Sequence, residues 1–433
     1  MTPLGITLIN TAVMALIGWI IVLQLIPVLI WFERKGAAII QDRWGPIRAN
    51  IGGVRLFGML HNIADVIKLL MKEDVTPNHV QKFYYYLAPF WSMTVALLPM
   101  MLIPLAAPVD FGDTKLRFAA GDYESGLLMI FAITGLSVFA VILAGWASNN
   151  KYSMLGGLRS SAQMISYELA IGLSIVAILM VYKTLHITSI VEQQGQLLNV
   201  YGFTLPLPNW GVVNQPIAFI VFLTALFAET NRTPFDLAES ESELVAGYHT
   251  EYSSMKFALF FMAEYGNMIV GAFVVSTLFF GGYQVPYMPT DMLRANPHWA
   301  LTGLLGITAV LAVAFGIMVF RRAPIMKALI KKGAGAYEYY AIAFVLFGAA
   351  VLALAGIGFG YTLDIGEDAA KIITIIFQVL VLSAKAIFFC WFYIQVRWTL
   401  PRFRYDQLMN LGWKILIPVS LLNILVTGTL KIL

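Results

Sequence analysis

The amino-acid sequence predicts an all-α integral membrane protein with about ten transmembrane helices and one interfacial amphipathic helix. Of its 433 residues, 59% are hydrophobic and only 12% are charged, whereas a soluble domain has roughly 25% charged residues. The hydrophobic residues form long runs, and about 20 apolar residues suffice to cross a bilayer core. A soluble fold is therefore excluded.

Ten apolar runs are long enough to be membrane spans. They lie at 6–32, 84–108, 125–147, 161–182, 212–228, 257–281, 299–320, 340–361, 372–395 and 415–433. The first run has no basic residue before it, which argues against a cleavable signal peptide.

Lys and Arg residues are concentrated in alternate loops. The loops at 33–82, 148–160, 230–256, 321–339 and 396–414 hold 21 of the 28, and the other loops and the C-terminus hold six. Because basic residues accumulate in cytoplasmic loops, we expect both termini to face outward.

Residues 55–72 have the pattern of an amphipathic helix. His61, Asp65, Lys68 and Lys72 recur at helical spacing, and nearly all the other residues are apolar. This pattern predicts a helix lying in the membrane interface, with a helix packed on a partner as the alternative.

The composition places redox chemistry outside this chain. The single cysteine, Cys390, excludes an intrachain disulfide or a cysteine-ligated iron–sulfur cluster. The sequence has no Walker loop or metal-ligand spacing, and Gly333-Ala-Gly335 lacks the context of a dinucleotide site. Electron or hydride transfer is therefore expected of partner chains.

An acidic loop follows the fifth run, at 229–251. It holds one arginine, Arg232, and six carboxylates: Glu229, Asp236, Glu239, Glu241, Glu243 and Glu251. Thr233-Pro234 has the form of a helix start, which would place Asp236, Glu239 and Glu243 on one helix face. Like charges this close titrate together, as suits proton relay, although a solvated acidic surface has the same spacing.

Two glutamates lie within predicted spans, Glu168 and Glu264. Charging an acid at bilayer depth costs several kcal/mol, so such groups are usually paired, protonated or beside a water-filled path. Lys385 in the ninth run is a candidate countercharge. Together with the acidic loop, the two glutamates indicate ionisable groups leading into the membrane interior, or else structural ion pairs.

Several motifs resemble those of one family of membrane proteins, the H-type subunits of bacterial complex I (NADH:quinone oxidoreductase), which are the counterparts of mitochondrial subunit 1. The resemblance covers about 1–282 and 370–433. It rests on the segments Glu33–Lys35, Gln41–Pro46, Ala64–Asp65, Ile67–Leu70, Lys72–Glu73, Ala228–Asp236, Glu241–Val245 and Arg397–Met409.

The resemblance implies a tunnel that admits ubiquinone or menaquinone from the bilayer. Its wall or mouth would include Glu33, Arg34, Arg43, Asp65, Arg232, Phe235 and Asp236. An acidic path coupling quinone reduction to proton movement would include Glu168, Glu229, Glu239, Glu241, Glu243 and Glu264. No residue of this chain would be catalytic in isolation, and the chain would bind no metal and no cofactor of its own.

The resemblance also implies partners and a location. The partners would be soluble iron–sulfur and quinone-site subunits, small membrane subunits, antiporter-like subunits and membrane lipid, with no nucleic acid. The location would be the bacterial inner membrane, with both termini periplasmic.

The chain departs from the family pattern in three places. A segment at 285–368 with two further spans separates a core at 1–282 from a C-terminal pair of spans at 370–433. Gly45-Pro46-Ile47 replaces the usual Gly-Pro-Asn, and His61-Asn62 replaces Gln-Pro. The last two lie beside the expected tunnel.

Three other classes of protein fit the same sequence features. A hydrogenase-, ferredoxin- or F420-linked complex would use a similar membrane protein. A stand-alone secondary transporter would use Glu168, Glu264 and Lys385 as its ion path. A passive membrane anchor for a redox arm would not need the intramembrane glutamates.

Overall fold

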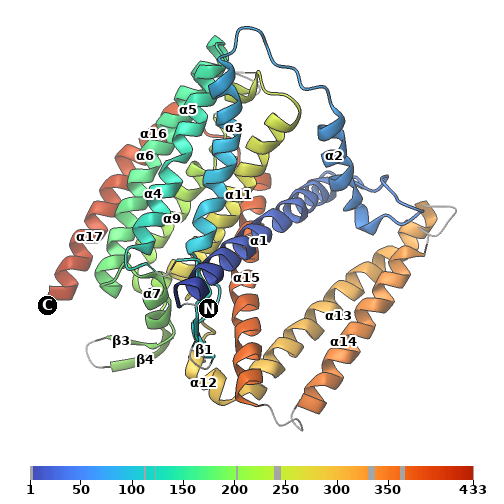
Figure 1. Ribbon diagram of the computed structural model, residues 1–433, viewed down its shortest axis with the longest axis vertical. Coiled ribbons are helices and arrows are strands. Elements are labelled where there is room, and N and C mark those ends of the chain that lie inside the picture. Colours follow the sequence, from blue (N-terminus) through green and yellow to red (C-terminus); the bar gives the residue numbers. More distant parts are fainter. Residues whose placement is uncertain are drawn as a thin grey trace.

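Long helices form almost the whole molecule (Figure 1). The computed structural model describes residues 3–111, 114–121, 123–200, 203–237, 245–329, 337–360 and 366–432. Within them, nine helices are long and apolar enough to cross a membrane, and a tenth apolar helix has 14 residues. The predicted all-α membrane fold is thus confirmed.

Each of the ten predicted spans corresponds to one helix or to consecutive helical segments. They are α1 (Pro3–Ile40), α3 (Lys82–Leu97) with η2 (Leu98–Leu102), α4 (Gly126–Gly135) with α5 (Ser137–Ala147), α6 (Lys151–Tyr182), α9 (Pro216–Glu229), α11 (Ser254–Phe279), α13 (Pro297–Leu329), α14 (Glu338–Gly360), α15 (Glu367–Thr399), and α16 (Tyr405–Asn410) with η5 (Leu411–Leu416) and α17 (Ile417–Ile432).

The shorter elements join these helices. They are η1 (Leu56–Gly58), α2 (Leu60–Met71), α7 (Ile187–Gln194), α8 (Gly211–Asn214), η3 (Gly247–His249), α12 (Thr290–Ala295), and the antiparallel pairs β1 (Val109–Phe111) with β2 (Thr114–Leu116) and β3 (Leu197–Val200) with β4 (Phe203–Pro208). Val109 pairs with Leu116, and Leu197 pairs with Pro208. These strands were not among the elements expected from the sequence.

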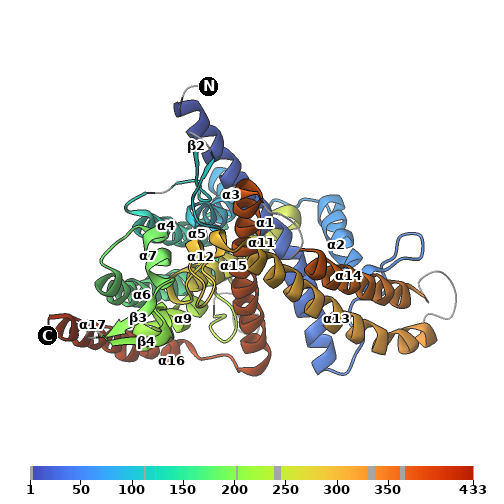
Figure 2. The ribbon, with the colours of Figure 1, turned by 90° about the horizontal axis from the view of Figure 1, so that it is seen from below.

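Most of the spans form one bundle, and two elements lie at its side (Figures 1 and 2). Helix α1 runs obliquely along the bundle, and the α13–α14 hairpin extends away from it beyond α15. We call the upper end of the bundle in Figure 1, where α9 and α15 end and α6 and α11 begin, the inner end. The sequence predicts that its loops face the cytoplasm.

Helix α2 confirms most of the amphipathic helix predicted at 55–72, although it begins only at Leu60. Its apolar side chains are largely unburied: Ile63 is 52% exposed, Ile67 54% and Leu70 62%. A helix in the membrane interface would present such a face to lipid.

Two predicted helix boundaries were wrong in ways that affect the site. Helix α1 continues to Ile40, so that Glu33 and Arg34 lie on a helix and not in a loop. No helix starts at Thr233-Pro234, because residues 230–237 form turns, with the Phe235 N–H donating to the Arg232 carbonyl at 2.8 Å. Glu239, Glu241 and Glu243 lie outside the described residues.

Glycines bring α5 and α6 close together next to the inner end. A Cβ atom on Gly145 of α5 would lie 2.9 Å from the Ser153 carbonyl oxygen, and one on Gly157 of α6 would lie 3.2 Å from the Val141 carbonyl oxygen. Small residues of this kind allow membrane helices to pack backbone against backbone.

We therefore expect Gly145→Val to separate α5 from α6, at a cost of about 1–3 kcal/mol for an overpacked contact. The midpoint of thermal denaturation of the purified protein measures this. Gly172→Val is the matched control, since no atom lies within 4 Å of a Cβ on Gly172 in α6. Equal midpoints for the two variants would contradict the prediction.

Candidate functional site

Glu33 is the meeting point of three segments at the inner end. Its carboxylate accepts a hydrogen bond from the Tyr265 hydroxyl of α11 at 2.8 Å and is ion-paired with Arg232 at 3.2 Å. Its other oxygen pairs with Arg397 near the end of α15. The extra turns of α1 beyond the predicted span are what place Glu33 here.

Arg232 lies in the turn after α9, and helix α6 holds that turn in place. The Gln163 amide of α6 donates to the Ala228 carbonyl at 2.7 Å and the Phe235 carbonyl at 2.9 Å. The same amide lies 3.2 Å from the Asn231 side-chain oxygen. One buried side chain therefore replaces the backbone hydrogen bonds that a helix would have made.

The Arg232 side chain connects two carboxylates. It is only 6% exposed, and its second terminal nitrogen lies 3.9 Å from the Glu264 carboxylate of α11. The guanidinium also lies 3.8 Å from the centroid of the Tyr265 ring. Burial by itself would lower the pKa of Arg232, but Tyr265 and the two glutamates outweigh it and raise this pKa above its ordinary value. Arg232 is therefore a permanent positive charge.

We call Glu33, Arg232, Glu264, Tyr265 and Arg397 the inner ion cluster. Its two carboxylates face two guanidiniums, so the charges balance. The Tyr248 hydroxyl lies 3.4 Å from Glu264 and extends the cluster towards η3. Such a balanced arrangement is the usual condition for burying charge.

Glu168 of α6 and Glu229 at the end of α9 form a second pair of carboxylates. Glu229 ends α9, close enough to Glu168 of α6 and to Tyr393 of α15 to interact electrostatically with both. Glu168 packs against Gly135, where α4 ends, and a Cβ there would overlap its carboxylate. The lack of a side chain on Gly135 therefore makes room for an acid among the helices.

Residues 400–404, which follow α15, cover the turn that carries Arg232. The Phe403 N–H donates to the Pro234 carbonyl at 3.0 Å, and Arg402 pairs with Asp236 at 2.9 Å. The Phe235 ring lies between Phe403 and Tyr167, with centroids 5.4 and 5.8 Å away. These contacts surround an apolar side chain with aromatic rings.

Helix α2 is joined to α1 by two polar contacts. Arg34 forms an ion pair with Asp65, and the Asn62 amide donates to the Pro27 carbonyl at 2.6 Å. Arg43 lies apart from them, exposed and donating to Gln41 at 2.7 Å. The structure therefore brings Arg34 and Asp65 together and leaves Arg43 outside the cluster.

Lys385 pairs with backbone carbonyls and is not the countercharge of the intramembrane glutamates. Its ammonium donates at 2.8 Å to each of three backbone carbonyls, those of Phe280, Gly282 and Gln284 just after α11. It also lies 5.3 Å from the centroid of the Trp210 ring. Carbonyl oxygens satisfy all three donors, so no carboxylate is required.

Sequence reasoning missed several members of the site. It named no role for Tyr265 or Tyr248, and it assigned Arg397 only to a motif. Gln163 was missed altogether. The signal available was weak: Tyr265 follows the intramembrane Glu264 directly, and Gln163 is a polar residue within an apolar run.

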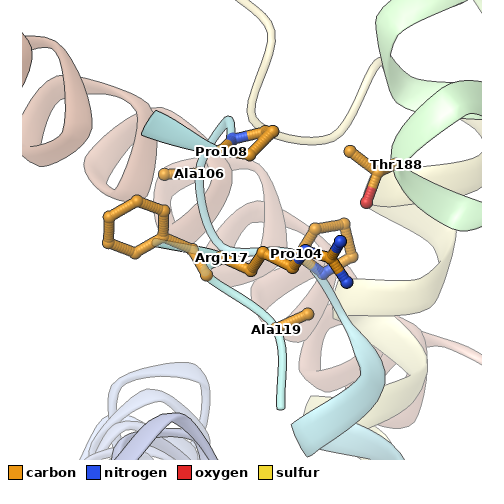
Figure 3. A pocket seen from close by; sticks show the side chains of 7 residues that line it. Pro104, Ala106, Pro108, Arg117, Ala119 and Thr188 are labelled. Atoms are coloured by element: carbon orange, nitrogen blue, oxygen red, sulfur yellow. The ribbon is translucent and has the colours of Figure 1, made fainter. Parts of the chain in front are cut away.

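Small hollows in the described part of the chain lie away from these charges. Figure 3 shows one lined by Pro104, Ala106, Pro108, Arg117, Phe118, Ala119 and Thr188. A second is lined by Ile103, Leu127, Ile130, Ile187, Val274, Thr277 and Leu278. No residue predicted for the tunnel lines either of them.

The chain is similar to one family of known proteins over nearly its whole length. Residues 12–428 match the family described as NADH dehydrogenase. The H-type subunit of the NADH-quinone oxidoreductase of Bdellovibrio bacteriovorus is 37% identical over 95% of this chain and 93% of its own length. An H-type subunit of the Solibacter usitatus enzyme is 43% identical over 92% and 91%, and subunit 8 of the Rhodothermus marinus enzyme is 39% identical over 95% of each.

The fold and the site define a multi-pass membrane protein that holds a buried ion cluster at one end of its helical bundle. The chain belongs to the NADH dehydrogenase family, among the H-type subunits of bacterial NADH-quinone oxidoreductase, or complex I. This membership sets aside the stand-alone transporter.

The inner ion cluster predicts a large stability effect at Arg232. Arg232→Met would leave two carboxylates buried without their shared cation, which typically costs about 3–5 kcal/mol. The denaturation midpoint of the purified complex measures the loss. Adding Glu264→Gln to Arg232→Met should restore part of it, since one uncompensated charge is removed.

Arg404→Met is the control for this prediction. Arg404 pairs with Asp406 at 2.6 Å, but its side chain is 75% exposed, so the denaturation midpoint should stay close to that of the unaltered complex. A drop as large as that of Arg232→Met would contradict the argument from burial.

Proposed function

We propose that this chain forms the quinone access tunnel of its complex and the acidic path that couples quinone reduction to proton translocation. The observation that carries the proposal is the position of Arg232 between Glu33 and Glu264. Glu33 belongs to the residues expected at the tunnel, and Glu264 to those expected in the acidic path. One guanidinium therefore joins the two groups.

Arg232 provides a physical basis for coupling between the tunnel and the acidic path. Two charges about 4 Å apart interact by roughly 4 kcal/mol at an effective dielectric constant of 20. A proton gained or lost by Glu33 would therefore change the field that Arg232 and Glu264 experience. Chemistry on the tunnel side would in this way alter the proton affinity of the first carboxylate of the path.

The tunnel would begin between α1 and α2. We call this opening, marked by the Arg34–Asp65 pair, the portal. The exposed apolar side chains of α2 suit the isoprenoid tail of ubiquinone or menaquinone, and the polar pair suits its headgroup. Further in, Phe235, Asp236 and Arg232 would form the wall, with Arg43 at the mouth.

The acidic path would pass through the two carboxylate groups of the inner end. Glu229 lies at the end of α9, Glu168 lies on α6 and Glu264 lies on α11. Glu239, Glu241 and Glu243 of the same acidic loop would complete it. Neighbouring carboxylates titrate together, which suits the relay of a proton from one to the next.

The chain would act only inside its complex. The reduction site itself would be built largely by soluble iron–sulfur and quinone-site subunits, and small membrane subunits and antiporter-like subunits would complete the membrane arm. The chain would lie in the bacterial inner membrane with both termini periplasmic, as the Lys and Arg distribution predicts. Its core at 1–282 and C-terminal pair at 370–433 would carry the tunnel, and 285–368 would be an added unit.

Replacing Glu229 tests the acidic path. Glu229→Gln removes an ionisable group but keeps its shape, so quinone-linked turnover and proton translocation should fall together by at least about tenfold. NADH:quinone reduction and quenching of a pH-sensitive dye in vesicles measure the two rates. Glu192→Gln, at an exposed site on α7, is the control. Unchanged rates in Glu229→Gln would remove this residue from the mechanism.

Replacing Asp65 tests the portal. Asp65→Asn breaks a half-exposed ion pair, so KM for quinone should rise about threefold to fivefold, equivalent to roughly 1 kcal/mol. Steady-state kinetics with a long-tailed quinone measure the change, and kcat should stay nearly constant. Lys68→Gln, at an exposed site on the same helix, is the control. The portal would be misplaced if both variants gave the same KM.

A further inference from the structure

The segment that leads into α2 has an unusual backbone. Leu56, Phe57 and Gly58 have φ angles of 45°, 57° and 91°, three consecutive residues in the left-handed region. Glycine adopts this region freely, but leucine and phenylalanine rarely do, because the Cβ approaches the following carbonyl. Such a turn persists only where surrounding contacts fix it.

Contacts from two directions fix this turn. From α1, the Trp31 indole donates to the Phe57 carbonyl at 3.0 Å. From α14, the Glu338 carboxylate accepts the Arg55 backbone N–H at 2.8 Å. The Tyr339 ring packs edge-on against the Phe57 ring, with centroids 4.9 Å apart.

The contacts from α14 are buried, although most of the hairpin is not. Glu338 is 7% exposed and Tyr339 is 4% exposed, whereas Phe344 and Leu352 further along α14 are 80% and 74% exposed. A small apolar cluster completes the contact, formed by Val319, Ala323, Tyr339 and Ala343 with Phe57 and Ile47. Both views show the inner ends of α13 and α14 next to the chain that precedes α2 (Figures 1 and 2).

We propose that the α13–α14 hairpin braces the quinone portal, with Glu338 and Tyr339 as positioning residues that fix the turn at 55–58 and thereby the placement of α2 against α1. This inference rests on the proposed function, because it assigns a purpose to the placement of α2. It gives the segment at 285–368 a role in the reaction of the complex, through α2 and not through contact with quinone.

The other contacts of α2 show why a brace matters. Beyond Asn62 and Asp65, which reach α1, α2 is tied to α11 at its far end, where the Ser254 hydroxyl donates to the Leu69 carbonyl at 2.8 Å. Most of its remaining surface is exposed. At its first end, the His61 ring accepts the backbone N–H groups of Arg48 and Ala49 at 3.0 and 3.1 Å, and the turn at 55–58 connects this end to α14.

The test uses the whole complex and conservative variants of the two residues. Glu338→Ala removes the acceptor for the Arg55 N–H, whereas Glu338→Gln keeps a carbonyl oxygen there. Tyr339→Ala removes the ring edge, whereas Tyr339→Phe keeps it. Tyr337→Ala is the matched control, since Tyr337 is 59% exposed on the same end of the hairpin.

The first readout is structural and independent of quinone. Spin labels on Lys68→Cys of α2 and Lys151→Cys of α6 report one distance; Cys390 of this chain is buried, and labelled complex without the two new cysteines gives the background from the other subunits. Both Ala variants at 338 and 339 should broaden the distance distribution, whereas the Gln, Phe and Tyr337→Ala variants should not. An unchanged distance distribution in both Glu338→Ala and Tyr339→Ala would overturn the proposed brace, regardless of the KM measured for Asp65→Asn.

The second readout is kinetic. The Ala variants at 338 and 339 should change KM for a long-tailed quinone by threefold or more. KM for a short-tailed analogue should change less, because a long tail must pass between α1 and α2. A broadened distribution with no change in either KM would overturn the positioning role. Failure of the proposed tunnel is distinguishable, because it would appear as an unaltered KM in Asp65→Asn with the brace intact.

Discussion

The inner end of the molecule depends on how the charge of Arg232 is balanced. A guanidinium that is only 6% exposed cannot remain among apolar helices without carboxylates nearby, because the loss of hydration costs several kcal/mol. Glu33 of α1 and Glu264 of α11 supply them, and Arg397 of α15 balances the second negative charge. The acidic loop and three helices must therefore meet at one place, which fixes the relative position of the elements around it.

The same charge balance makes the site sensitive to the protonation of either carboxylate. In a cluster with two carboxylates and two guanidiniums, neutralising one carboxylate leaves one positive charge uncompensated, and the low dielectric of the surroundings strengthens the effect. Glu229 and Glu168 are a further pair of carboxylates next to the same turn. In the proposed function, the residues that stabilise the fold would thus largely be the residues that respond to quinone chemistry.

The spans could be predicted from the sequence because membrane insertion depends on local composition. The partners of Glu33 could not, since Arg232 and Arg397 lie 199 and 364 residues away in the chain. The helix expected at Thr233-Pro234 failed for a related reason. A good local start signal was overridden by tertiary hydrogen bonds, from the Gln163 amide and from the Phe403 N–H. The role of Lys385 was equally hidden, because its partners are backbone carbonyls, which every residue carries.

The two ends of the α11–α15 contact are held by interactions of different kinds. At the outer end, the Lys385 ammonium uses all three donors on backbone carbonyls, and these acceptors keep their polarity whatever the state of the carboxylates. At the inner end, Glu33 receives both the Tyr265 hydroxyl of α11 and the Arg397 guanidinium of α15. Protonation of Glu33 would therefore weaken the inner connection and leave the outer one intact. In the proposed function, a change in the charge of Glu33 would therefore act on the inner connection between these helices and not on the outer one.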